Sequence, residues 1–394
     1  MMHPEALDIL TARLEEKRRA GLGRSLVTVG PATGARVRVQ GKDCLLMAGN
    51  DYLGLCRHPA LVEAAKNASH KLGAGCGASR LAAGTMDGHQ ELERKIAEFK
   101  HTEAALFFST GYMTNLAAIS GLAGPDDLVV SDSLNHASII DACRLSRARI
   151  KVYPHNHPKE AARILAAEKT KGLKLLVTDG VFSMDGDLAL LPDLWEAARK
   201  NGALMVVDDA HATGVWGAAG RGTLEFFRMI PQPGLIQVGT FSKALGGLGG
   251  FVAADQVVIN SLIQGARPLL YTTAPPPAQT AVAEKALDLV DEEPWRREKL
   301  HNLSRRLRNG LIEKGFSVKS QSGPILPVMV GEASRAVAMA KSLLKNGLYA
   351  PAMRPPTVPA GESRIRVTVS AAHTEEDVDF AVKAFEEARQ ELFS

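Results

Sequence analysis

Short apolar runs alternate with longer mixed segments through the middle of the chain, from about residue 104 to residue 254. The runs that favour strands lie at residues 105–108, 127–130, 149–153, 175–178, 203–207 and 234–238. Largely apolar strands separated by helices are typical of a parallel sheet covered on both faces. The pattern therefore predicts an α/β fold with a mostly parallel central sheet covered by helices.

The pattern changes after the proline cluster at residues 274–277. A charged helical stretch near residues 291–312 and an alternating segment at residues 363–369 follow it. Together they predict a smaller α+β C-terminal domain. We expect an N-terminal arm or helix, a large ligand-binding domain and a small domain that closes over the site, at residues 1–50, 51–285 and 286–394.

Composition places the chain among ordinary globular proteins. Its 394 residues are 45% hydrophobic and 23% charged, and 47 basic against 43 acidic side chains leave a net charge of +4. A balance this small, with no run of five like charges, does not indicate binding to nucleic acid. The chain also shows no apolar signal core near its N-terminus and no stretch of the ~18 apolar residues that span a membrane. We therefore expect a cytoplasmic protein with no membrane partner.

The four cysteines are scattered along the first part of the chain, at positions 44, 56, 76 and 143. They form no Cys-x-x-Cys pair and have no regular spacing. Such an arrangement predicts free thiols in a reducing compartment, which agrees with the cytoplasm.

One lysine follows the last apolar run in a loop of small residues. Lys243 lies in the segment Thr240-Phe241-Ser242-Lys243-Ala244-Leu245-Gly246-Gly247. A lysine that attacks an aldehyde must first lose its proton, and a desolvated pocket lowers its pKa because burial disfavours the ammonium form. Most lysines are solvated surface charges, so Lys243 by itself is weak evidence of catalysis.

A second candidate site follows the run at residues 203–207. Two carboxylates and a histidine come directly after it, in Asp208-Asp209-Ala210-His211. Ligands of open α/β sheets bind at such carboxyl ends of strands. By itself, the segment Asp208-Asp209-Ala210-His211 favours a turn that contains an ordinary loop histidine. With Lys243, however, the chain holds an imine lysine, an acidic partner for a pyridine nitrogen and a donor to a phenolic oxygen, which are the groups that pyridoxal phosphate needs.

Two glycine-containing segments have competing interpretations. Gly111 and Tyr112 open a predicted helix directly after a strand, where free N–H groups bind phosphate, although an ordinary helix cap is the commoner meaning. Residues 73–78 fit the G-x-G-x-x-G/A pattern of nicotinamide-binding proteins, with Glu93 twenty residues past Gly73. That pattern requires a preceding strand, whereas residues 59–66 favour a helix, so we reject it.

These motifs, in this order, resemble those of the pyridoxal-phosphate-dependent α-oxoamine synthases, which share the fold type of aspartate aminotransferase. The resemblance runs along nearly the whole chain. It rests on residues 50–55, 79–85, 111–112, 133–138, 179–187, 208–214, 240–243 and 354–361. It implies pyridoxal-phosphate fold type I and a homodimer with its sites at the subunit interface.

The resemblance also implies a role for each residue that matches a family motif. The residues expected to bind the cofactor are Gly111, Tyr112, His136, Ser183, Asp208, His211, Thr240 and Lys243, with His136 stacked on the pyridine ring and Lys243, His136 and Asp208 catalytic. The residues expected near the substrates are Arg24, Asn50, His136, Arg354 and Thr357, with Arg354 as the fork for the amino-acid carboxylate. No metal is expected, and the His155-Asn156-His157 segment is interpreted as a surface loop.

The reaction implied is the decarboxylative condensation of an amino acid with an acyl thioester, carried by coenzyme A or an acyl carrier protein. Residues 271–279 and 354–359 most resemble the branch that joins L-alanine to a pimeloyl thioester in biotin synthesis. Asp179, where many such enzymes have glutamate, favours instead the branch that joins glycine to acetyl-CoA. Outside the family, a nicotinamide oxidoreductase and a binding protein without catalysis are the alternatives.

Overall fold

The apolar runs form one seven-stranded sheet in the order β4-β10-β9-β8-β7-β5-β6. Its strands are β4 (Ala104–Phe108), β5 (Leu128–Asp132), β6 (Arg149–Tyr153), β7 (Lys174–Asp179), β8 (Leu204–Asp208), β9 (Leu235–Thr240) and β10 (Gly250–Ala254). Strands β5 to β9 pair in parallel, and β10 runs antiparallel to both β4 and β9. The predicted fold class, a mostly parallel sheet covered by helices, is confirmed.

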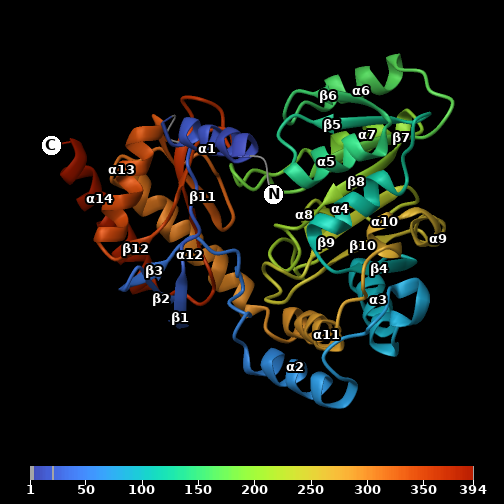
Figure 1. Ribbon diagram of the computed structural model, residues 1–394, viewed down its shortest axis with the longest axis horizontal. Helices are drawn as coiled ribbons and strands as arrows, with labels where there is room; N and C mark the ends of the chain where they lie inside the picture. The colour runs from blue at the N-terminus through green and yellow to red at the C-terminus, as the bar shows by residue number, and fades with distance from the viewer. Residues whose placement is uncertain (1–3, 20–21, 394) are drawn as a thin grey trace.

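Helices cover both faces of this sheet in the computed structural model, which describes residues 4–19 and 22–393 (Figure 1). Val129 and Val206 pack in one buried cluster, whereas Val130 and Val207 pack in another. Helices α4 (Gly111–Ser120), α5 (Ala137–Ser146) and α9 (Gln256–Gly265) supply the first cluster. Helices α6 (Pro158–Ala167) and α7 (Leu191–Lys200) supply the second. A strand buried on both faces needs apolar residues at successive positions, which is the pattern of the sequence.

The second lobe holds two small sheets. One has the order β1-β2-β3-β12 and the other β11-β14-β13. Their strands are β1 (Val29–Thr33), β2 (Arg36–Val39), β3 (Lys42–Leu46), β11 (Ile325–Gly331), β12 (Leu348–Tyr349), β13 (Ala352–Met353) and β14 (Ser363–Thr368). Helices of this lobe are α1 (Pro4–Arg19), α12 (Trp295–Glu313), α13 (Ala333–Lys345) and α14 (Glu375–Phe393). Because β3 pairs in parallel with β12, strands from both ends of the chain share this lobe. The three predicted domain ranges stay a prediction.

The proline cluster begins a helix that the sequence pattern did not reveal. Pro276 caps α11 (Pro277–Glu292), and Pro277 is its first residue, where a missing N–H costs nothing. Helix α11 packs against α2 (Pro59–Leu72) and α3 (Asp87–Lys100). The charged helix expected near residues 291–312 is α12, which begins four residues later than expected, at Trp295.

The remaining short elements complete the large lobe. They are the π-helix η1 (Arg80–Gly84) and the helices α8 (Thr223–Phe226) and α10 (Arg267–Leu270). The glycine pattern at residues 73–78 follows helix α2, with Gly73 as its C-cap at φ +87°. The dinucleotide motif would need a strand there, so its rejection is confirmed. All four cysteines are free thiols. Among the described residues, none of the helices has the length and apolar character needed to cross a membrane.

A buried ion pair joins α3 to the loop after β8. Lys100 Nζ lies 3.4 Å from Asp209 Oδ2, and both side chains are fully buried. Replacing Lys100 with Met would leave an unpaired carboxylate in the core, which typically costs about 3–5 kcal/mol of unfolding free energy. We predict a loss of that size for Lys100→Met in urea denaturation. The control is Lys66→Met, which breaks an exposed pair with Glu63 and should cost less than about 1 kcal/mol. Equal losses in the two variants would contradict the prediction.

Candidate active site

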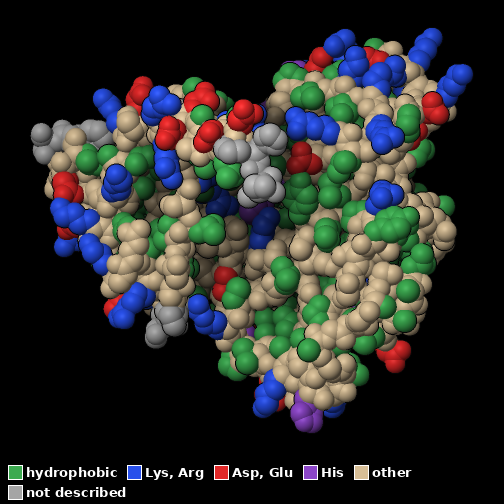
Figure 2. All heavy atoms as spheres, viewed as in Figure 1, with side chains coloured by type: hydrophobic (Ala, Val, Ile, Leu, Met, Phe, Trp, Pro, Cys, Tyr) green, Lys and Arg blue, Asp and Glu red, His purple; other side chains and the backbone are tan. Residues whose placement is uncertain are grey.

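The carboxyl ends of the parallel strands surround a cavity of about 220 Å³. Its lining includes most of the residues expected to bind a cofactor, namely Gly111, Tyr112, His136, Asp208, His211, Thr240 and Lys243. Figure 2 shows a hollow between the two lobes with basic side chains at its floor. The structure thus gathers residues that are separated by up to 132 positions in the chain (Gly111 to Lys243) around one cavity.

Lys243 begins a hydrogen-bonded chain that leads to the second lobe. Its Nζ lies 2.9 Å from His211 Nε2, and His211 Nδ1 lies 2.8 Å from the Tyr52 hydroxyl. Tyr52 donates in turn to Asn50 Oδ1 at 3.2 Å. If Lys243 donates to Nε2, a neutral His211 must carry its proton on Nδ1, so the chain of donors runs in one direction. Burial lowers the pKa of His211 well below its usual value, which favours this neutral ring.

The amine of Lys243 is poised to lose its proton. Burial lowers its pKa from 10.5 to about 8, although the carboxylates of Asp208 and Asp179 oppose the shift. The positive charge of Arg366 acts in the same direction as burial. An amine with this pKa is partly unprotonated near neutral pH, as a nucleophile or proton acceptor must be.

Asp208 and Asp209 point to different surroundings although they are adjacent. Asp208, the last residue of β8, is 4% exposed and lines the cavity, where Asn115 Nδ2 donates to its Oδ2 at 2.6 Å. Its other oxygen accepts the N–H of Ala210 at 2.9 Å. Asp209 instead pairs with Lys100 and accepts the Thr223 N–H at 3.0 Å. Of the two carboxylates, Asp208 alone is available to a ligand, and Asp209 holds the loop.

The start of helix α4 forms the other end of the cavity. Gly111 and Tyr112 occupy its first positions, whose N–H groups have no carbonyl partner within a helix. Thr240 faces them, because a Cβ added at Gly111 would lie 3.1 Å from Thr240 Oγ1. Thr240 Oγ1 donates to the Gly249 carbonyl at 2.6 Å, which fixes its position. Free N–H groups, a helix dipole and a hydroxyl are a suitable surrounding for a phosphate.

His136 lies on the rim between the two ends. Its backbone N–H donates to Asp179 Oδ2 at 2.7 Å, and its Nδ1 lies 2.7 Å from Ser138 Oγ. Burial lowers the pKa of the His136 ring, so an uncharged aromatic face is presented to the cavity. Burial, together with the nearby charge of Asp208, raises the pKa of Asp179 well above its usual value.

The remaining predicted residues lie outside this lining. The Ser183 carbonyl accepts from Arg366 Nε at 2.6 Å, and Asn50 belongs to the chain from Lys243. Arg354 Nη2 donates to the Gly23 carbonyl at 2.9 Å, which brings the N-terminal segment with the exposed Arg24 beside it. Thr357 is exposed, and its N–H donates to the Arg354 carbonyl at 3.0 Å.

Several residues of the site were missed by the sequence reasoning. Arg366 is 5% exposed, and its Nη2 lies 3.3 Å from Asn50 Oδ1. The alternation at residues 363–369 correctly predicts strand β14, but both of its arginines are buried rather than solvated. Asn115 was also missed, because nothing in its local sequence distinguishes it from a core residue, and Tyr52 was given no role although it lies in the matching segment 50–55. A pair of arginines two positions apart, on the same face of a predicted strand, was the one available signal.

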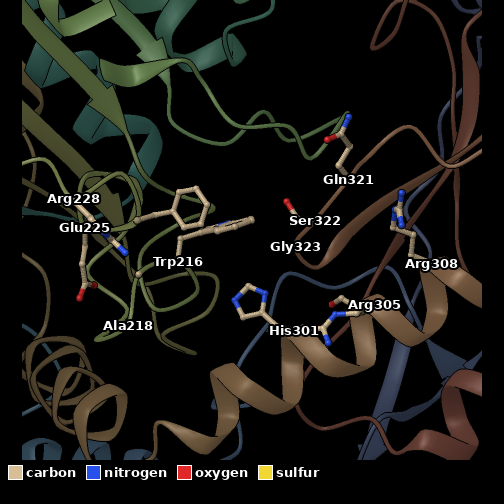
Figure 3. Close-up of a pocket in the computed structure, with 13 residues that line it drawn as sticks. Trp216, Ala218, Glu225, Arg228, His301, Arg305, Arg308, Gln321, Ser322 and Gly323 are labelled. Atoms are coloured by element: carbon tan, nitrogen blue, oxygen red, sulfur yellow. The ribbon is translucent and has the colours of Figure 1, made fainter. Parts of the chain in front are cut away.

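A larger cavity lies elsewhere, between residues 216–228, helix α12 and residues 321–323 (Figure 3). Its volume is about 660 Å³, and Trp216, His301, Arg305 and Arg308 contribute to its lining. None of the residues predicted for cofactor or substrate lines it. Volume alone would therefore select the wrong cavity, whereas the chemistry of the lining selects the one at Lys243.

Comparisons with known proteins agree with this geometry. The family model for aminotransferase class I and II matches residues 42–385. The 8-amino-7-oxononanoate synthase of Geobacter sulfurreducens is 47% identical, with 97% of this chain and 98% of the relative covered. That of Exiguobacterium sibiricum is 44% identical, with 97% and 98% covered.

Solved structures give the same result for the fold. A structure of SPT with a PLP internal aldimine has a TM-score of 0.91 and 32% identity, covering 99% of both chains. The 8-amino-7-oxononanoate synthase of Francisella tularensis has a TM-score of 0.77 and 28% identity, covering 89% of this chain and 99% of the other. The predicted resemblance to the α-oxoamine synthases and the predicted fold type are confirmed.

The low pKa of Lys243 leads to a direct test in the cofactor-free protein. We predict that acylation of Lys243 by acetic anhydride, followed by mass spectrometry of its peptide, rises with pH around a midpoint of about 8. Asp208→Asn should move the midpoint to lower pH, because the Asp208 carboxylate raises the pKa of the amine. A midpoint near the ordinary value of 10.5 would show that the amine is not desolvated.

Proposed function

The chain belongs to the aminotransferase class I and II family, and from that premise we propose that it is an 8-amino-7-oxononanoate synthase. The reaction condenses L-alanine with a pimeloyl thioester and releases carbon dioxide and the free thiol carrier, a step of biotin synthesis. The relatives of that name are 42–47% identical over nearly the whole chain. The observation that carries the proposal is the placement of Lys243, Asp208 and His211 around one cavity at the start of α4.

Pyridoxal phosphate is the cofactor of this reaction, and the described residues fit it. The first N–H groups of α4 and the Thr240 hydroxyl, which lies close to Gly111, line the same end of the cavity and would hold the phosphate. Asp208 offers a carboxylate to the pyridine nitrogen, and Asn115 Oδ1, buried without a partner, lies beside it. His211 would contact the phenolic oxygen, Ser183 the pyridoxal and His136 the ring face. Bound pyridoxal phosphate supplies a carbonyl carbon that joins an amine and a ring that withdraws electrons.

The chain's own residues would then move one proton and hold one charge. Lys243 accepts the α-proton of the amino acid at Nζ, because burial holds its pKa close to neutrality. Asp208 holds a positive charge at the pyridine nitrogen, and the bond from Asn115 fixes the direction of its carboxylate. His211, held by Tyr52 at 2.8 Å, stays oriented when Lys243 moves.

Two arginines are candidates for the amino-acid carboxylate. Arg354 carries the role expected from the family, and Pro355 and Pro356 behind it restrict its backbone. Arg366 lies deeper, with Asn50 and Tyr52 beside it. A guanidinium on a buried strand loses little entropy on binding and can form a bidentate pair. We therefore propose that Arg366 and Asn50 meet the carboxylate together with Arg354.

The acyl donor would enter from the N-terminal side. Arg354 binds the carbonyl of Gly23, and this contact places Arg24 and Thr357 near the same edge, where they would meet the acyl chain or its far carboxyl end. The carrier is coenzyme A or an acyl carrier protein. A homodimer with sites at the subunit interface is part of the proposal, as is a cytoplasmic location.

A product assay tests the assignment of substrates. Purified holoenzyme should turn over L-alanine with a pimeloyl thioester faster than glycine with acetyl-CoA or serine with palmitoyl-CoA, measured as aminoketone by mass spectrometry. Faster turnover of glycine with acetyl-CoA would assign the chain to 2-amino-3-ketobutyrate CoA ligase instead, in line with Asp179. Uptake of a nicotinamide nucleotide by a colourless protein would reject the family chemistry altogether.

Lys243→Ala tests the lysine separately from the fold. Borohydride should attach pyridoxal phosphate to the Lys243 peptide of the wild-type holoenzyme and to no peptide of the variant. Turnover should be lost, while thermal stability is retained, since the phosphate end at Gly111 and Thr240 is a separate part of the cavity. Normal turnover in Lys243→Ala would remove this residue from the mechanism.

Asp208→Asn should still bind pyridoxal phosphate and lose α-proton exchange with alanine.

A further inference from the structure

His155 lies just past β6, the edge strand of the large sheet, which pairs with β5 (Figure 1). It bridges two carboxylates, one on each side of its ring. Nδ1 lies 3.0 Å from Asp132 Oδ1, and Nε2 lies 2.8 Å from Asp187 Oδ2. The ring packs edge-on against Phe182, with 4.3 Å between centroids. The segment that the sequence analysis interpreted as a plain surface loop is therefore the centre of an ionic network.

Two carboxylates on one imidazole require that both ring nitrogens carry protons. A neutral ring has a single N–H and can donate to only one of them. Burial by itself would lower the pKa of His155, but the hydrogen bonds to Asp132 and Asp187 outweigh burial and raise it to about 9. The bridge is thus an imidazolium between two anions at neutral pH, with each nitrogen committed to a different loop.

The Asp132 side of the bridge supports the loop that leads to His136. Asp132 side-chain oxygens also accept the N–H of Leu134 at 2.8 Å and that of Asn156 at 2.9 Å. Two residues beyond Leu134, His136 faces the cavity of Lys243. A shift of Asp132 would therefore be passed directly to the backbone that positions the His136 ring.

The Asp187 side supports the loop that carries Ser183. Asn156 reinforces this side, since its Nδ2 donates to the Leu188 carbonyl at 2.8 Å and its Oδ1 accepts from Leu190 N at 2.9 Å. On the far side, strand β14 holds the same loop: Arg366 Nε donates to the Ser183 carbonyl, and Arg364 pairs with Asp185. Other charged groups near His155, across a cavity of about 390 Å³, are Asp185 and Lys319, which pair at 2.9 Å.

We propose that His155 is a positioning residue for the cofactor site, which it serves by fixing the Ser183 loop against the His136 loop through Asp187 and Asp132. This inference rests on the proposed function, because Ser183 and His136 matter only if pyridoxal phosphate lies between them. His155 itself is not among the residues that line the cavity of Lys243. It acts by fixing the distance and angle between the Ser183 loop and the His136 loop, which follow different strands.

The test compares His155→Gln with His157→Asn. His157 is two residues away and exposed, and it caps helix α6 through Nδ1, a role that asparagine retains. The readouts are the dissociation constant of pyridoxal phosphate, the absorbance of the bound cofactor, KM for alanine, kcat and melting temperature. His155→Gln should lower kcat by about tenfold or more, since a misplacement of about 1 Å can cost ~100-fold in rate. It should also raise the dissociation constant of pyridoxal phosphate. His157→Asn should match the wild type in every readout.

A double variant separates positioning from general damage. The glutamine amide at position 155 can donate to Asp132 and accept from an asparagine amide at position 187. His155→Gln combined with Asp187→Asn therefore restores both hydrogen bonds with no charge at positions 155 and 187. We expect the double variant to recover most of the affinity for pyridoxal phosphate that His155→Gln loses. A His155→Gln protein that melts earlier but binds pyridoxal phosphate with unchanged affinity and absorbance would overturn the proposal, as would a double variant worse than either single change.

The pH dependence checks the charge on the bridge. The pKa of His155 is raised in the folded protein, so the protonated ring stabilises the folded structure. This stabilisation is complete below the ordinary histidine pKa of 6.5 and is lost as pH rises through about 9. The ratio of the dissociation constants of His155→Gln and wild type should therefore fall towards one above pH 9. Titration of Lys243 affects both proteins and cancels in this ratio. A ratio that stays constant to pH 10 would overturn the proposal.

These outcomes are distinct from a failure of the proposed function. A wild-type protein that binds pyridoxal phosphate yet makes no aminoketone from alanine and a pimeloyl thioester would refute the substrate assignment. The ratio of cofactor dissociation constants would still decide the role of His155. A wild-type protein with no affinity for pyridoxal phosphate would refute both.

Discussion

The site depends on lowering the pKa of one amine in a protein that places two carboxylates close to it. Asp208 and Asp179 favour the ammonium form of Lys243, whereas burial and the charge of Arg366 disfavour it. Burial is the largest of these effects, and the pKa falls to about 8. The position of Lys243 after a buried strand is what makes the balance possible, since the same residue on a solvated loop would lose the dominant effect.

The parts of the fold and site that the sequence predicted share one property, which is that their signal is local. Each buried strand is a short apolar run, and the chemical groups lie at or just past its end, with Asp208 as the last residue of β8 and Lys243 three residues after β9. Because parallel strands align their carboxyl ends, local order along the chain becomes proximity in space. The same reasoning links Gly111, after β4, to Thr240, although β4 joins the sheet through the antiparallel strand β10.

The parts that the sequence did not predict depend on partners far along the chain. Arg366 meets Ser183 and Asn50 across 183 and 316 positions, and Asn115 meets Asp208 across 93. Such residues look like ordinary members of a strand or helix until the lobes are assembled. Helix α11 was missed for a different reason. Its prolines were interpreted as a break in the pattern of strands and helices. At the first position of a helix, however, proline costs little, because the N–H that it lacks would have no carbonyl partner within the helix.

The two lobes meet through buried guanidinium groups rather than through apolar surface alone. Arg364 is 1% exposed and pairs with Asp185, and Arg366 is 5% exposed and holds the Ser183 carbonyl. A buried ion pair adds little net stability, because desolvation offsets most of its Coulomb attraction, but a mispaired one is costly. Strand β14 can therefore dock in few ways on the Ser183 loop. His155 restrains that loop from the opposite side with the same kind of interaction. Charged groups that contribute little to the stability of the fold thus restrain the Ser183 loop from both sides.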